Sequence, residues 1–200
     1  MSFDTIQPPH EALYISSMLQ HTKSARDSIE IVSKWLKLVS VEDKRALDLD
    51  RSELLRQLQS ILHQAGCIAR YFFPGGRKPD ALHIGRAMQL RKAFDVDVGN
   101  PLSMKDLRNA IEHFDEHLDK YLTKHQSGEF VVQHVGYVPE EPGTYLHIFK
   151  GFYTKSMIFV LLGQSFEMAP IVNEVLRIHQ ALLVCESNGY RLPSLQRSSL

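Results

Sequence analysis

The chain has 200 residues, of which 44% are hydrophobic and 23% charged, with equal numbers of basic and acidic side chains. This length and composition predict a single folded domain, residues 1–200, that is large enough to bury a core without disulfides. A net charge of zero excludes a strong overall field that would attract nucleic acid or an anionic membrane, but a local basic patch is compatible with it. The longest apolar run, Met157–Leu162, is far too short to span a bilayer.

The cysteine content and the first residues both favour a cytoplasmic protein. Cys67 and Cys185 lie in apolar helical patterns and show no CxxC spacing, so we expect buried free thiols and no structural zinc site. The start, MSFDTIQPPHEAL, has neither the basic region nor the apolar region of a signal peptide. No feature of the sequence requires a cofactor.

Three helices are predicted in the first half of the chain. Apolar residues recur at intervals of three and four from His10 to about Leu38. A second helix follows Asp50, which precedes Glu53 in the manner of a capping box, and it ends before Pro74-Gly75-Gly76. A third is expected over Ala81–Phe94.

The central prediction is a helix over Ser103–Lys124, with Ser103 and Asp106 forming a capping box at its start. At about 100° per residue, one side of this helix forms an apolar stripe that would face the other helices. The stripe consists of Leu107, Ile111, Phe114, Leu118, Tyr121 and Leu122.

After Gly128 the hydrophobic period changes from 3.6 to 2. The segments Glu129–Gly136, Tyr145–Lys150 and Lys155–Gly163 predict an antiparallel meander of two or three strands, with a turn at Pro139–Gly143. A last helix runs from Pro170 to about Asn188 and ends at Gly189. The predicted fold is therefore mainly α, a bundle of about five helices (10–125 and 168–188) with a small antiparallel β-meander inserted at 129–163.

The central helix also carries the candidate catalytic residues Arg108, Asn109 and His113. On a helical projection, Arg108 lies about 140° from His113, on the other flank of the apolar stripe. One copy of the helix therefore does not readily present both side chains to one small substrate. A site shared across a two-fold homodimer would remove this difficulty.

The sequence R108-N-A-I-E-H113 resembles the R-x4–6-H motif of the HEPN superfamily of helical bundles, and Asn109 matches the polar residue that usually follows the motif arginine. The resemblance covers about residues 10–125 and 170–188, and the meander lies outside it. Many HEPN proteins are dimeric, metal-independent endoribonucleases of toxin or defence systems. The resemblance therefore implies a homodimer, an RNA substrate and an antitoxin or other protein partner. The toxin subgroup with R-x4-H-x-Y would have Tyr where this chain has Asp115, so the chain departs from the motif of that subgroup at this position.

Under this hypothesis His113 would transfer protons during RNA cleavage, and Arg108 would pair with the scissile phosphate. Asn109 would position a phosphate oxygen or His113. A basic stretch would hold the RNA backbone, with an affinity that depends on salt. This stretch comprises Arg70, Arg77, Lys78, Arg86, Arg91 and Lys92.

Besides a HEPN-like but inactive binding module, three other interpretations remain open. Arg108 and Glu112 are spaced for a surface ion pair, in which case the segment is an ordinary exposed helix face. His113 and His117, four residues apart, could share a metal, although HExxH is absent and a third ligand would have to come from another helix. The chain could also be a non-catalytic protein-interaction or scaffold module.

Overall fold

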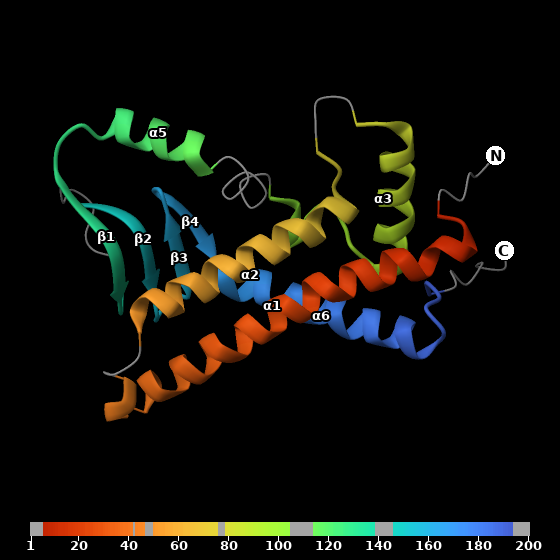
Figure 1. Cartoon of the computed structure of the whole chain (residues 1–200), viewed down its shortest axis with the longest axis horizontal. Coiled ribbons are helices and arrows are strands. Elements are labelled where there is room, and N and C mark those ends of the chain that lie inside the picture. Colours follow the sequence, from red (N-terminus) through yellow and green to blue (C-terminus); the bar gives the residue numbers. More distant parts are fainter. Residues whose placement is uncertain are drawn as a thin grey trace.

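The computed structural model describes residues 6–41, 43–46, 50–75, 79–104, 114–138 and 146–193. Five α-helices and four strands lie within these ranges, and the strands come directly before the last helix (Figure 1). The predicted mainly helical fold with a small sheet before the last helix is confirmed. In the described part of the chain, no helix has the length and apolar character needed to cross a bilayer.

Three long helices form the core. Helix α1 (Glu11–Ser40) packs along α2 (Arg51–Phe72) and along α6 (Met168–Ser187), and their inward residues belong to one buried apolar cluster. Ile15, Leu62 and Ile178 represent the three helices in it, each with 0% of its surface exposed. Burial of this apolar surface is the main source of stability, because each fully buried aliphatic side chain contributes about 1.5–3 kcal/mol.

Sequence signals set the ends of these helices. Asp50 caps α2, as predicted, by accepting a hydrogen bond from the Ser52 amide at 2.8 Å. Helix α6 ends as predicted at Gly189, whose φ of +73° lets the Tyr190 amide bond back to the Cys185 carbonyl. Short 3₁₀ turns, Pro8–His10, Lys44–Ala46 and Pro101–Ser103, occur in the connections.

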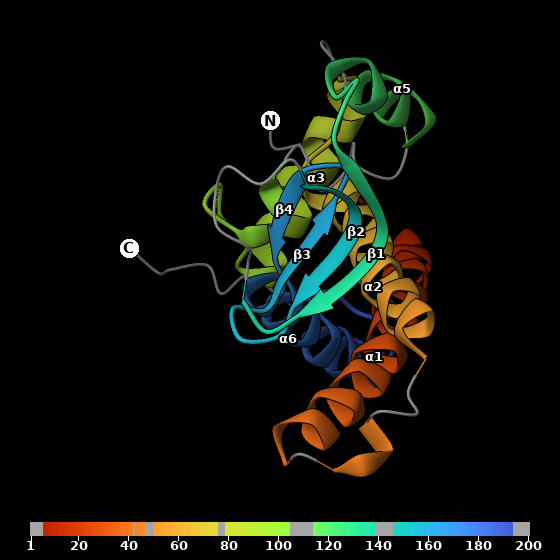
Figure 2. The same ribbon diagram turned by 90° about the vertical axis from the view of Figure 1, so that its left-hand side faces the viewer.

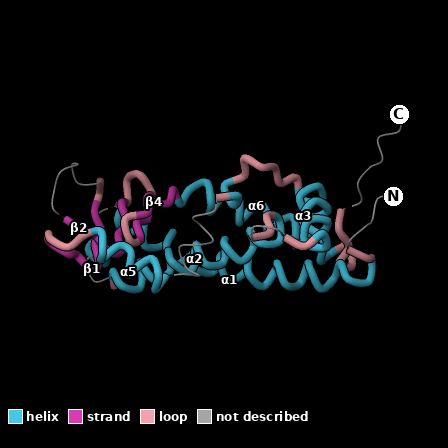
Figure 3. The backbone as a smooth tube through the Cα atoms, turned by 90° about the horizontal axis from the view of Figure 1, so that it is seen from above, coloured by secondary structure: helices cyan, strands magenta, loops and turns pink. Residues whose placement is uncertain are grey.

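Helix α3 (Ala81–Phe94) occupies the bounds predicted for it, and it stands across the end of the bundle away from the sheet (Figure 3). Asp80 caps its start, and Asp95 ends it in the left-handed conformation at φ +51°. Arg177 of α6 holds that end: its guanidinium pairs with Glu174 at 2.7 Å and donates to the Phe94 carbonyl at 2.9 Å.

The sheet contains β1 (Glu129–Gly136), β2 (Leu146–Tyr153), β3 (Ile158–Leu161) and β4 (Gln164–Glu167), in that spatial order (Figure 2). Phe152, Phe159 and Phe166 lie opposite one another on neighbouring strands and are buried in the core cluster. Lys150 donates to Gln59 at 2.6 Å, which ties the sheet to α2.

The meander prediction needs two corrections. Strands β2, β3 and β4 are antiparallel, but β1 pairs with β2 in parallel. The predicted turn at Pro139–Gly143 lies outside the described residues, in the connection over residues 137–145. That connection is longer than the about two to five residues of common hairpin loops. The β segment also continues beyond the predicted limit at 163, since β4 runs to Glu167.

The predicted helix over Ser103–Lys124 is confirmed only in its second half, as α5 (Phe114–Lys124). It does not begin at Ser103, because Ser103 ends a 3₁₀ turn and Met104 has an extended ψ of 123°. Leu122 is 47% exposed and therefore does not belong to the buried stripe, whereas Tyr121 is buried. Residues 105–113 lie outside the described ranges.

Candidate functional site

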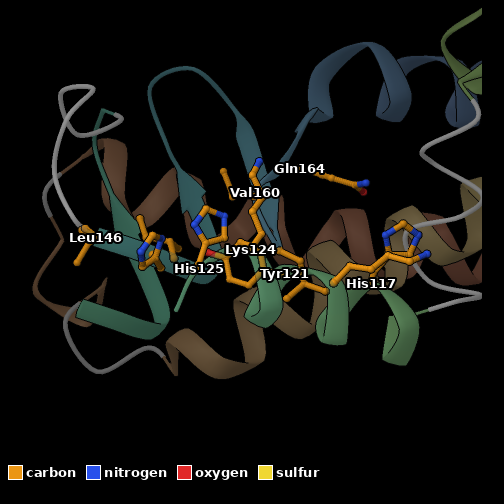
Figure 4. Close-up of a pocket in the computed structure, with 12 residues that line it drawn as sticks. His117, Tyr121, Lys124, His125, Leu146, Val160 and Gln164 are labelled. Atoms are coloured by element: carbon orange, nitrogen blue, oxygen red, sulfur yellow. The ribbon is translucent and has the colours of Figure 1, made fainter. Parts of the chain in front are cut away.

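A pocket of about 570 Å³ lies between α5 and one end of the sheet (Figure 4). Strands β1 and β2 begin at this end, and the turn from β3 to β4 closes it (Figure 2). One wall is the inner face of α5, and the other is formed by the start of β2 and by that turn. The described lining residues are His117, Lys120, Tyr121, Lys124, His125, Leu146, His147, Ile148, Val160, Leu162, Gly163 and Gln164.

The helical period places the α5 side chains in the pocket. His117, Tyr121 and Lys124 recur at four and three residues and so share one face. Two aromatic contacts attach that face to the sheet: Phe114 meets Phe149 edge-on at 5.9 Å, and the buried Tyr121 meets His147 at 6.4 Å between ring centroids. These two contacts set the position of α5 against the sheet.

Gly163 forms the opposite wall at the turn between β3 and β4. Its φ of +76° is one that residues with a Cβ rarely adopt, and a Cβ here would lie 3.2 Å from the Tyr121 ring. The turn and the tyrosine therefore pack as closely as they do because position 163 has no side chain.

Tyr121, His125 and His147 form an aromatic cluster at the inner end of the pocket. The His125 ring lies 4.7 Å from Tyr121 and 4.4 Å from His147, between centroids. His147 Nε2 lies 2.9 Å from the Ser127 carbonyl. A carbonyl oxygen only accepts, so Nε2 carries the proton, and Nδ1 is left as the acceptor in the neutral ring.

The pocket has a positive electrostatic character. Lys120, Lys124 and three histidines line it, and none of its described lining residues is acidic. Glu116 lies 3.9 Å from Lys120, but both side chains are largely exposed, so the pair screens the lysine only weakly. Partial burial, together with His147 and Lys124, lowers the pKa of His125, and burial raises the pKa of Tyr121.

This arrangement favours a site that binds an anion over a catalytic site that places an acid and a base on either side of it. The His125 and His147 rings, with centroids 4.4 Å apart, lie against each other, so the two are not separated by the width of a ligand. Lys120 and Lys124 are one turn apart, about 6 Å along the helix axis, and supply two separate positive charges. Gln164 adds an amide that can donate hydrogen bonds.

The predicted catalytic residues Arg108, Asn109 and His113 lie outside the described residues. They directly precede α5 in the chain. Of the weaker predicted metal pair, His117 lies in the pocket and His113 is outside the description. Within the described ranges, no group of three or more His, Cys, Asp or Glu side chains is placed to hold a metal ion.

The predicted basic stretch is at α3 and the end of α2, and two of its arginines have structural contacts there. Arg86 donates to the Arg70 carbonyl at 3.0 Å, which satisfies the last turn of α2. Arg91 lies over the Phe73 ring at 5.7 Å, and Lys92 is exposed. Arg77 and Lys78 lie outside the described residues.

Sequence reasoning did not identify Lys120, Lys124, His125 or His147 as site residues. Part of the signal was present, because the projection of the central helix already placed His113 and His117 together, and Lys124 extends that flank. The contribution of His147 could not be found in this way, since it comes from a strand brought to α5 by tertiary packing.

Comparison with known proteins adds no assignment. No family model matches the chain, and neither a curated protein nor a solved structure matches it at a significant level.

Proposed function

We propose that this protein binds RNA and that the pocket between α5 and the sheet holds phosphates of the RNA backbone. The observation that carries the proposal is the lining of two lysines and three histidines with no acidic residue among the described ones. Lysine binds phosphate as a point charge, and its head group stays mobile enough to follow a flexible chain. Two lysines one turn apart suit consecutive phosphates better than a single small anion.

The predicted HEPN-like chemistry extends this proposal to metal-independent cleavage of the bound RNA. Arg108 would pair with the scissile phosphate, and His113 would transfer the proton, with Asn109 positioning one of them. These residues come immediately before α5, so in the chain they adjoin the helix that lines the pocket. Because Arg108 and His113 project to opposite flanks of a helix, the proposal includes a homodimer.

Binding is tested with a fluorescently labelled RNA and a Lys120→Gln, Lys124→Gln double variant. The variant should bind more weakly and its affinity should depend less on salt, with a log–log slope smaller by about 1.4 for two lost phosphate contacts on a single strand. The matched control is Lys92→Gln, which removes an exposed lysine from α3. If the salt slope is unchanged in the double variant but smaller in Lys92→Gln, the RNA-binding surface is on α3 and not at the pocket.

Cleavage is tested separately, with RNA incubated in excess EDTA beside Arg108→Ala and His113→Ala variants. We expect cleavage by the wild-type protein and a loss in both variants. Undiminished cleavage by either variant rejects the assigned roles. Binding without cleavage leaves a non-catalytic RNA-binding protein.

A second candidate function, a protein-interaction module, is favoured by one observation on α3. Leu82, Ile84 and Met88 are 60%, 41% and 55% exposed, and only a narrow stripe of α3 is buried. Exposed apolar groups on one helix are a common feature of protein interfaces. Light scattering of the wild type and of Ile84→Glu tests this: a defined oligomer that the substitution dissociates supports the interaction module.

A further inference from the structure

Strand β1 carries a large aromatic side chain at the edge of the pocket that the core does not use. Phe130 is 45% exposed, and β1 is the edge strand of the sheet. Its ring lies 5.0 Å from the His147 ring, with 38° between the planes. His147 lines the pocket, so Phe130 extends the aromatic cluster outward from the phosphate-binding lysines.

The parallel register explains this position. Phe130 is the direct partner of His147 in the pairing of β1 with β2, so the two side chains leave the sheet on the same face. Val132, two residues further along β1, shares that face and is 66% exposed. An exposed strip of one aromatic ring and one aliphatic side chain therefore runs along the sheet edge from the pocket.

We propose that Phe130, supported by His147, is a stacking platform for an unpaired base of an RNA whose phosphates lie in the pocket. This inference rests on the proposed RNA binding and adds a preference for single strands. Every base offers a flat face for stacking on an aromatic ring, whereas bases within a duplex are already stacked on one another. The platform therefore distinguishes single-stranded from double-stranded RNA without reading sequence.

Charge complementarity is the reason to place RNA on this strip. The strip is continuous with a pocket lined by Lys120, Lys124 and His117, so a ligand that covers it needs an apolar face next to negative charge. A nucleotide has both. If a second copy of this chain covered the strip instead, its own cationic pocket would lie near the first one and repel it, unless the copy approached only along β1.

The test compares three labelled ligands in fluorescence anisotropy at one salt concentration: an eight-nucleotide oligouridine, an abasic ribose-phosphate chain of the same length, and an eight-base-pair RNA duplex. The variant is Phe130→Leu, which keeps an apolar side chain and removes the ring at an exposed position. The control is Tyr137→Leu, which removes an aromatic side chain that is 66% exposed just beyond β1.

The wild type should bind oligouridine more tightly than both other ligands. Phe130→Leu should weaken oligouridine binding by about 5- to 160-fold, the range for one base–aromatic stack, and leave binding of the abasic chain unaffected. Tyr137→Leu should bind all three ligands as the wild type does.

Each contrary result points to a different cause. Equal affinity for oligouridine and the abasic chain overturns the platform while the proposed phosphate binding stands. If none of the three ligands binds, the proposed function fails and the platform with it. If Phe130→Leu dissociates a dimer in light scattering without changing RNA affinity, β1 is an interface between copies and the platform is rejected.

Discussion

The imidazole rings of His125 and His147 lie 4.4 Å apart, although one follows a helix and the other belongs to a strand. Partial burial, together with the neighbouring His147 and Lys124, lowers the pKa of His125 from its ordinary value of 6.5. The cost of protonating His125 is reduced when an anion enters the pocket. Ligand binding and proton binding at this site are therefore linked.

Phosphate-chain affinity should increase as the pH falls from about 7 through the lowered pKa of His125, because the anion stabilises the protonated ring. Titrations with the abasic chain between pH 5 and 8 measure this. His125→Gln should flatten the pH dependence and have its largest effect in the acid range. An equal slope in wild type and variant would assign the dependence to other groups.

Gly163→Ala should weaken both the fold and the pocket. The alanine would adopt an unfavourable φ, which costs about 1–2 kcal/mol, and its Cβ would displace the Tyr121 ring. Gly189→Ala is the matched control, since Gly189 has φ +73° but a Cβ there meets nothing within 4 Å. Both variants should lose stability in urea unfolding, whereas only Gly163→Ala should lose affinity for the phosphate chain.

Arg177→Met should destabilise the protein by about 2–4 kcal/mol, because it leaves the Glu174 carboxylate, only 10% exposed, without its main partner. The Phe94 carbonyl also loses a donor. Arg56→Met is the control, since Arg56 pairs with Glu53 at the same spacing but both side chains are exposed. The stability lost in Arg56→Met should stay below about 1 kcal/mol. Equal midpoint shifts in urea would contradict the role of burial.

His179 should make the protein less stable in acid. Its Nδ1 lies 2.9 Å from the Thr22 hydroxyl, which itself donates to the Leu19 carbonyl, so Nδ1 carries the proton and the buried Nε2 is bare. Burial, with Arg26 nearby, lowers the pKa of His179 below 6.5. The unfolded chain therefore takes up a proton first as the pH falls, and it is stabilised relative to the folded state.

The free energy of unfolding should then have its full value above about pH 6.5, fall below it, and level off under the folded-state pKa. Urea unfolding at a series of pH values measures this. His179→Asn keeps a donor toward Thr22 and should reduce the fall, whereas His83→Asn on the exposed face of α3 should not. If both variants fall as the wild type does, His179 is not the group responsible.

Local signals in the sequence were sufficient for the elements that end in a strong cap or breaker. The bounds of α3 follow from its apolar pattern, and those of α2 follow from Asp50 and Pro74. The predicted helix does not begin at Ser103, which is a good cap in isolation but here belongs to the 3₁₀ turn Pro101–Ser103 that Asn100 caps. The four-residue strand β4 was missed because it is too short to show a period.

One reason explains why neither the direction of β1 nor the composition of the pocket could be predicted. Alternation of polar and apolar residues shows which side chains share a face, but it is the same for a parallel and an antiparallel strand. The partnership of Phe130 with His147 therefore depends on a pairing that no local pattern encodes. The lysines of α5 were visible in the sequence, but their histidine partner on β2 was not.

The contacts between α1 and α6 constrain the order in which the molecule can be completed. Thr22 contacts His179 of α6, and the Glu11 carboxylate accepts from the Leu192 amide, just beyond α6, at 2.8 Å. The contacts of α1 are therefore completed only by α6 and the residues that follow it. On the ribosome, α1 and α2 can pair early, but one apolar side of that hairpin stays open until α6 has emerged. The core shared by these three helices therefore stays incomplete until α6 has been synthesised, and until then the exposed apolar side of the α1–α2 pair is prone to aggregation.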